Sequence, residues 1–157
     1  AASDVYKRQA HTRWATHGGV SDTNAHPHMS QNGEIAVVHN GIIDNARRLS
    51  NRLTQRGIEL KSETDSELLV HKNTIRIESG QEPLEAVRKT LTRITGTWGL
   101  CVLFKEYDMI VCARNGSPLI LGQGEGESFV SSDPHALTQH NQNFFYLQRV
   151  HVVQHNK

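Results

Sequence analysis

A chain of 157 residues has room for one domain with a sizeable core, but not for a second full catalytic domain. Its 36% hydrophobic and 21% charged residues lie on the polar side of a globular composition and far from the composition of disordered chains. The 17 basic residues are scattered among 16 acidic ones without a basic stripe, which argues against a nucleic-acid partner. The chain has no apolar run of membrane-spanning length and starts with no signal peptide, so we expect a cytoplasmic protein without membrane contact.

The first nine residues show no periodicity and no helix cap, and they join abruptly onto a motif-rich segment that begins at Ala10 or His11. The peptide SDVYKRQ resembles translated adapter sequence at the ends of assembled reads. We therefore expect residues 1–9 to be a non-native leader or sequencing artefact and exclude them from the fold.

The following elements are predicted in chain order. Residues 34–39 form a short apolar run that favours a buried strand, ended by the turn signal Asn40-Gly41. Residues 45–56, with Leu49 and Leu53 four apart, predict an amphipathic helix that stops at Gly57. Ser62 or Thr64 can cap a second helix that runs to about residue 80, and Pro83 begins a third that ends before Gly96.

The remainder changes to short β-rich runs separated by Gly, Asp, Asn and Pro. These runs cover residues 98–104, 109–113, 119–121, 128–131, 144–147 and 151–154. One strand, then helices, then many strands predicts an α+β layered sandwich. Cys101 and Cys112 lie inside two of the apolar runs, where a cysteine is usually a small buried hydrophobe rather than a zinc ligand or half of a disulfide.

Polar residues of chemical interest gather in three segments, HTRWATHGG from His11, NAHPH from Asn24 and HNGIIDN from His39. Such residues are costly to bury without partners, so their density predicts a polar site. Metal is a weak alternative, because no carboxylate or cysteine accompanies the histidines at ligand spacing. We expect no metal and no cofactor, and we interpret His26, His28 and His39 as structural, satisfied by hydrogen bonds near a sheet edge.

Taken in order with SETDSE (62–67), RNGSPL (114–119) and FVSSDPHAL (129–137), these segments resemble the glutaminase domain of glutamine:fructose-6-phosphate aminotransferases. The resemblance begins at about Ala10 and reaches nearly to the C-terminus. It implies an N-terminal-nucleophile hydrolase fold, a four-layer αββα sandwich with two antiparallel sheets. It also implies a mechanism in which a free N-terminal cysteine attacks the side-chain amide of L-glutamine with its own amine as base.

The resemblance also implies roles for individual residues. Asn40 and Gly41 match the oxyanion-hole pair, which offers a side-chain NH₂ and a backbone N–H to the developing charge. The alternative for this pair is a plain strand-to-helix turn. Arg13 matches the residue that binds the substrate α-carboxylate and Asp65 the partner of the α-ammonium. The alternatives are a surface salt bridge for Arg13 and a helix-start carboxylate for Asp65.

Three further residues of the first motif match the lining of the glutamine pocket. Thr16 and His17 match polar wall residues, and Trp14 matches the aromatic side chain that screens the pocket and the ammonia path. For these three residues, simple packing remains an equal alternative, since Thr, His and Trp are common at half-buried positions.

One feature of the resembled family has no counterpart here, because neither Cys101 nor Cys112 matches its N-terminal cysteine. We therefore expect residues 10–157 to be a partial, N-terminally incomplete domain that is inactive alone. The resemblance places sugar-phosphate isomerase domains, with fructose 6-phosphate as acceptor, elsewhere in a homo-oligomeric parent chain. Two alternatives stay open: a glutaminase domain serving another acceptor, as in amidophosphoribosyltransferase, asparagine synthetase or glutamate synthase, and a non-catalytic glutamine-binding module.

Overall fold

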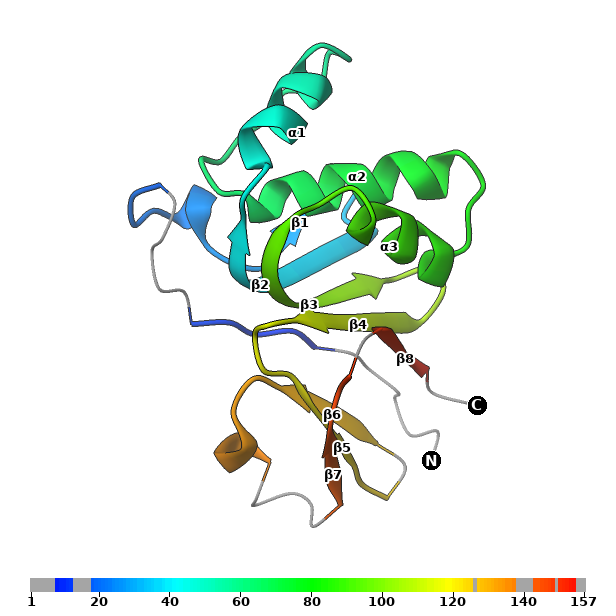
Figure 1. Cartoon of the computed structure of the whole chain (residues 1–157). Helices are drawn as coiled ribbons and strands as arrows, with labels where there is room; N and C mark the ends of the chain where they lie inside the picture. The colour runs from blue at the N-terminus through cyan, green and yellow to red at the C-terminus, as the bar shows by residue number, and fades with distance from the viewer. Residues whose placement is uncertain (1–7, 13–17, 126, 138–142, 149, 155–157) are drawn as a thin grey trace.

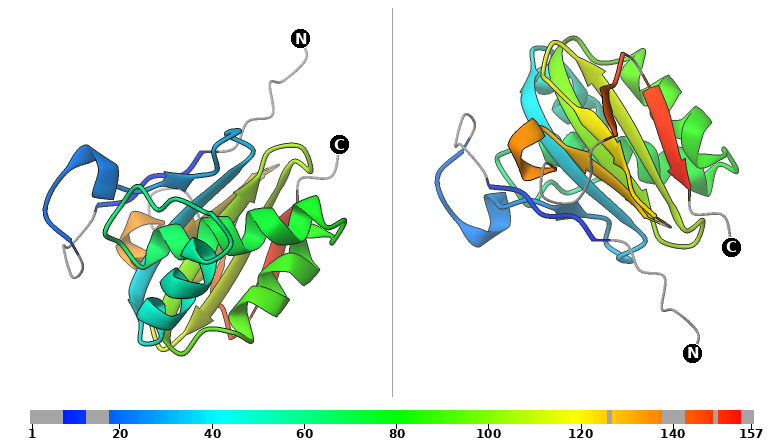
Figure 2. Two further views of the ribbon diagram at one scale, coloured as in Figure 1. Left: turned by 90° about the horizontal axis from the view of Figure 1, so that it is seen from above. Right: turned by 90° about the horizontal axis from the view of Figure 1, so that it is seen from below.

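A computed structural model of the chain, shown in Figure 1, describes residues 8–12, 18–125, 127–137, 143–148 and 150–154. A five-stranded antiparallel sheet in the order β1-β2-β3-β4-β8 forms its centre, and a second antiparallel sheet has the order β6-β5-β7. The helices lie over one face of the larger sheet and the smaller sheet lies below the other face (Figure 2). The two antiparallel sheets and the helical layer confirm the α+β fold class.

The elements have the following bounds. The helices are α1 (Ala46–Thr54), α2 (Ser66–Glu78) and α3 (Pro83–Leu91), with short 3₁₀ turns η1 (Asp22–Asn24) and η2 (Pro134–Ala136). The strands are β1 (His28–Met29), β2 (Ile35–Ile43), β3 (Gly96–Phe104), β4 (Met109–Asn115), β5 (Ile120–Gln123), β6 (Ser128–Ser131), β7 (Phe144–Tyr146) and β8 (Val150–Gln154). No helix among these described segments is long and apolar enough to cross a membrane.

The helical predictions agree with the structure to within a few residues. Leu49 and Leu53 are buried on the inner face of α1, as their spacing predicts. Helix α2 begins later than the predicted caps, since Asp65 is the residue that precedes its first turn. Thr64 still acts locally as a cap, because its Oγ1 accepts a 3.4 Å hydrogen bond from the backbone N–H of Glu67.

Strands β2 and β3 form the middle of the molecule and separate two apolar clusters. Val37 and Val102 are fully buried, and together with Leu49, Leu69 and Val87 they belong to the core between the sheet and the helices. A smaller cluster on the other face joins Cys101 and Cys112 to residues around the small sheet, Leu119 and Leu147. Because side chains alternate along a strand, Ile35, Val37 and Ile43 of β2 belong to the first cluster and Val38 packs against the second.

The turn predicted at Asn40-Gly41 is wrong, because β2 runs through both residues to Ile43, paired throughout with β3. The glycine is explained by crowding rather than by a turn. Gly41 has φ +127°, and a Cβ placed on it would lie 2.1 Å from the carbonyl oxygen of Thr97 on β3. Only a residue without a side chain allows the two backbones to approach this closely while staying paired.

The two cysteines are neighbours across β3 and β4 and are expected to resist thiol reagents in the native protein. Cys112 is fully buried, Cys101 is 8% exposed, and the Sγ atoms lie 3.5 Å apart. The hydrogen bond to Cys101, together with burial, raises the pKa of the Cys112 thiol well above its ordinary value, so little thiolate is available to react. Maleimide labelling followed by mass spectrometry should find both thiols protected in buffer and both modified in urea. Rapid native labelling would contradict the buried-pair assignment.

Candidate functional site

Asn40 lies on the face of β2 that looks away from the helices. Val38, two residues earlier, packs against the cluster near the small sheet, and alternation places Asn40 on the same side. There the Asn40 Oδ1 lies 2.5 Å from Nε2 of His11, a residue 29 positions earlier in the chain. The half-buried carboxamide is therefore held by a neighbour outside the sheet.

Asp65 approaches the same strand from the helical side. Its carboxylate is 6% exposed, and Oδ2 accepts a 2.8 Å hydrogen bond from the backbone N–H of Ile43 at the end of β2. Oδ1 lies 3.4 Å from Ser66 Oγ and 3.9 Å from Nδ1 of His39. One oxygen thus joins the start of α2 to the end of β2, on the side of that strand opposite Asn40, and the other faces Ser66 and His39.

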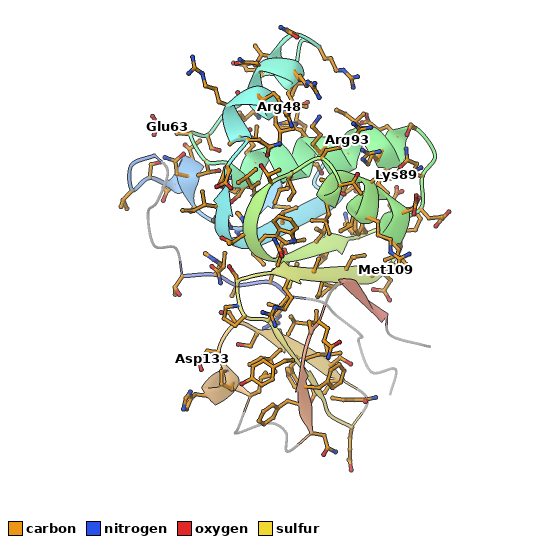
Figure 3. All side chains as sticks on the ribbon, viewed as in Figure 1. Arg48, Glu63, Lys89, Arg93, Met109 and Asp133 are labelled. Carbon is orange, nitrogen blue, oxygen red and sulfur yellow. The ribbon has the colours of Figure 1, made fainter. Side chains whose placement is uncertain are left out.

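The whole segment from Ser62 to Glu67 is a polar junction, in which successive residues bind different parts of the fold. Thr64 Oγ1 lies 2.8 Å from His28 Nε2 on β1, and Ser66 Oγ lies 2.9 Å from His39 Nδ1 on β2. Glu63, labelled in Figure 3, lies beside the loop around η1. Its Oε2 accepts hydrogen bonds from Asn24 Nδ2 and Gly19 N, and its own N–H donates to Asn24 Oδ1. We name this segment the 62–67 junction.

Glu67, the last residue of the junction, binds the backbone at the start of the same segment. Burial works to raise the pKa of this carboxyl, but hydrogen bonds from Lys61 N, from Ser62 N and Oγ, and from His71 outweigh burial and hold it below its ordinary value. A carboxylate that accepts several N–H and O–H groups is stabilised in its charged form. Glu67 is therefore a structural anchor for the turn that leads into α2.

Four of the predicted site residues, Arg13, Trp14, Thr16 and His17, lie outside the described residues. The chain on both sides of them is nevertheless placed: His11 contacts Asn40, and Gly19 binds Glu63 of the 62–67 junction. Gly18 fits tightly against this junction, since a Cβ on it would lie 2.7 Å from both Asn24 and Glu63. His11, at the start of the first motif, therefore lies beside β2, and Gly18 and Gly19, at its end, lie beside the start of α2.

The histidines that we interpreted as structural are hydrogen-bonded, as predicted. His28 and His39 are buried against the 62–67 junction, and His26 Nδ1 accepts a 3.3 Å hydrogen bond from the backbone N–H of His39. Sequence reasoning assigned no role to His11, whose contact with Asn40 connects two motifs. Its place at the head of the first motif was the available signal, but only the fold shows its partner.

Among the described residues, no group of three or more His, Cys, Asp or Glu is arranged to hold a metal ion. A cavity of about 290 Å³ lies at the far end of β2, lined among others by Glu34, Glu78, Phe104 and Tyr107. Because it touches neither Asn40 nor Asp65, it does not belong to the candidate site.

Asp65 is expected to contribute to stability through its acceptor oxygen rather than through its charge. Changing Asp65 to Ala leaves the Ile43 N–H buried without a partner, which should lower the free energy of unfolding by about 1–3 kcal/mol. Changing it to Asn keeps an acceptor of the same shape and should retain most of that stability. Urea unfolding followed by circular dichroism measures both. Equal destabilisation by the two variants would show that the charge matters more than the hydrogen bond.

The sequence matches a family of glutamine amidotransferase domains and enzymes that contain such a domain. The family model described as "Glutamine amidotransferase domain" matches residues 11–139. The chain is 46% identical over 140 residues to the glutamine–fructose-6-phosphate aminotransferase (isomerizing) of Zymomonas mobilis, which covers 88% of this chain and 23% of that protein. The enzyme of the same name from Chlorobaculum tepidum is 48% identical over 141 residues, with the same shares covered. The chain therefore spans less than a quarter of the length of these relatives.

Comparison of structures supports the fold. The glutamine phosphoribosylpyrophosphate amidotransferase of B. subtilis superposes with a TM-score of 0.67 at 21% identity, over 93% of this chain and 34% of that protein. At this identity the similarity concerns the arrangement of sheets and helices. It agrees with the two antiparallel sheets and the helical layer described above.

Proposed function

Since this chain belongs to the glutamine amidotransferase domain family, we propose that it is the glutamine-hydrolysing part of a glutamine:fructose-6-phosphate aminotransferase, releasing ammonia for glucosamine 6-phosphate synthesis. The observation that carries this proposal is the 44–49% identity to curated enzymes of that name along most of the chain. We further propose that residues 10–157 are a partial domain, and that the sugar-phosphate isomerase domains lie elsewhere in a longer, cytoplasmic, homo-oligomeric parent.

For the chemistry, we assign the oxyanion hole to the Asn40 side-chain NH₂ and the Gly41 backbone N–H. Two donors fixed in advance stabilise the charge that develops on the amide oxygen without reorganising during the reaction. For Gly41, the pairing of β2 with β3 fixes the position of the backbone that carries this N–H. The proposal leaves the nucleophile and its base to an N-terminal cysteine.

The two charged ends of glutamine are assigned to Arg13 and Asp65, with Trp14, Thr16 and His17 along the wall of the pocket. A planar guanidinium suits a carboxylate because it can donate two parallel hydrogen bonds. For Asp65, the hydrogen bond from Ile43 to Oδ2 fixes the carboxylate, and we assign the ammonium to Oδ1, which also faces Ser66 and His39. This assignment predicts that Asp65→Asn raises KM for glutamine even though it preserves stability.

The proposed function is tested by two assays on two forms of the protein. The full-length enzyme that carries this chain should form glutamate and glucosamine 6-phosphate in equal amounts from glutamine and fructose 6-phosphate. The 157-residue polypeptide should release no glutamate, because the thiols of Cys101 and Cys112 are buried between strands and cannot attack a substrate.

Three outcomes would contradict parts of this proposal. Glutamate release by the 157-residue polypeptide, abolished by thiol alkylation, would mean that one of the two buried cysteines is a nucleophile. Full-length enzyme that hydrolyses glutamine but aminates phosphoribosyl pyrophosphate or aspartate instead of fructose 6-phosphate would favour a different acceptor. Glutamine binding without hydrolysis by the full-length protein would favour a non-catalytic binding module.

A further inference from the structure

The proposed oxyanion hole gives no role to the contact between His11 and Asn40. Nε2 of His11 and Oδ1 of Asn40 are 2.5 Å apart, although 29 residues separate them in the chain. A hydrogen bond joins these two side chains. Oδ1 of a carboxamide is only an acceptor, so with Oδ1 toward the imidazole the donor is Nε2–H. This orientation of Asn40 pairs with the His11 tautomer that carries hydrogen at Nε2, whereas the opposite orientation pairs with a bare Nε2.

The direction of this hydrogen bond decides what Asn40 can offer to a substrate. With Nε2–H donating to Oδ1, the NH₂ group of Asn40 is turned away from His11 and remains a donor. With a bare Nε2, the carboxamide would be more stable after a rotation that lets its NH₂ donate to the imidazole, and Oδ1 would point the other way. An oxygen acceptor in that place would repel a developing oxyanion, whereas an NH₂ donor would stabilise it.

His11 is held for this task by a second histidine. Its ring stacks on His26, with centroids 4.3 Å apart and planes 24° from parallel. His26 is itself fixed, because its Nδ1 accepts a hydrogen bond from the backbone N–H of His39, the residue before Asn40. His26 also makes an edge contact with His28, whose Nε2 binds Thr64 of the 62–67 junction. The Nδ1 of His11 is buried and has no hydrogen-bond partner among the described residues, so stacking and the Nε2 contact are what orient the ring.

We propose that His11 is a positioning residue, which fixes the carboxamide of Asn40 through Nε2–H so that its NH₂ group faces the oxygen of the reacting amide. This inference rests on the proposed function, since it requires Asn40 to be an oxyanion donor. His11 does not touch the substrate in this scheme. It acts only through Asn40, and this restriction makes the role testable.

The test is a double-mutant cycle in the full-length enzyme, with kcat and KM measured for glutamine hydrolysis. His11→Phe keeps an aromatic ring to stack on His26 but removes the donor, and it should lower kcat by roughly tenfold or more, with KM changed less than about twofold. His11→Gln keeps an N–H donor and should recover a large part of the lost kcat. In an Asn40→Ala background, His11→Phe should have no further effect, because the group that it orients is absent.

Two controls separate this role from a structural one and from the proposed function. Synthesis from ammonia and fructose 6-phosphate should be unchanged in every His11 variant, which shows that the enzyme is folded. Two results would overturn the positioning role and leave the proposed function intact. In the first, the fold losses of kcat from His11→Phe and Asn40→Ala multiply in the double variant. In the second, His11→Phe raises KM and leaves kcat unchanged. An unmutated enzyme that does not hydrolyse glutamine would overturn the proposed function, and this role with it.

Discussion

Replacement of Asn40 by alanine in the full-length enzyme is expected to lower kcat for glutamine hydrolysis by about 10²–10³-fold, the usual effect of removing one oxyanion donor. The fold should survive, because the Asn40 side chain is only half-buried and its strand is held by backbone pairing with β3. Steady-state glutamate release measures the loss. Because the donor acts on the transition state, KM should change far less than kcat.

A matched control for this change is Asn51→Ala, since Asn51 is an exposed asparagine on α1 and lies outside the candidate site. Its kcat should equal that of the unmutated enzyme. Ammonia-dependent synthesis should be retained in both variants, since it bypasses glutamine hydrolysis. If Asn40→Ala lost both activities together, the effect would be on folding, and the oxyanion assignment would lose its support.

Replacement of Gly41 by alanine is expected to cost about 3 kcal/mol or more of stability, because backbone strain and a steric clash add together. The strain comes from φ +127°, which L residues rarely adopt, and the clash from a Cβ 2.1 Å from the Thr97 carbonyl oxygen. The three atoms nearest to this Cβ all belong to the backbone of β3, so β3 cannot move away without breaking its pairing with β2. Urea unfolding of the 157-residue protein measures the loss.

Gly57→Ala is the control that separates the steric clash from the backbone strain in the stability loss of Gly41→Ala. Gly57 also has positive φ, +78°, but a Cβ there would have no heavy atom within 4 Å. This variant should lose only the left-handed strain of about 1–2 kcal/mol. Similar losses for the two variants would show that β2 and β3 can separate near Gly41, and that their close approach is not what selects glycine.

The boundaries of the local elements could be predicted from sequence because their causes are local. Apolar spacing located all three helices, and Gly57 and Pro83 marked an end and a beginning. Alternating β-rich runs located the later strands to within one or two residues. The Asn40-Gly41 turn failed for a non-local reason. An Asn-Gly pair is a turn signal in isolation, but here pairing with β3 extends the strand through it.

The order of motifs also determined the family, since HTRWATHG, HNG and SETDSE at their spacing indicated a glutamine amidotransferase domain before any fold was seen. Which residues of different motifs contact one another was decided only by the tertiary structure. The acceptor role of Asp65 toward Ile43, the binding of Glu63 to Asn24, and the contact of His11 with Asn40 all join residues at least 22 positions apart. Hydrogen bonds over such separations depend on strand register and on how α2 sits on the sheet, and neither is encoded in the identity of a single residue or its neighbours.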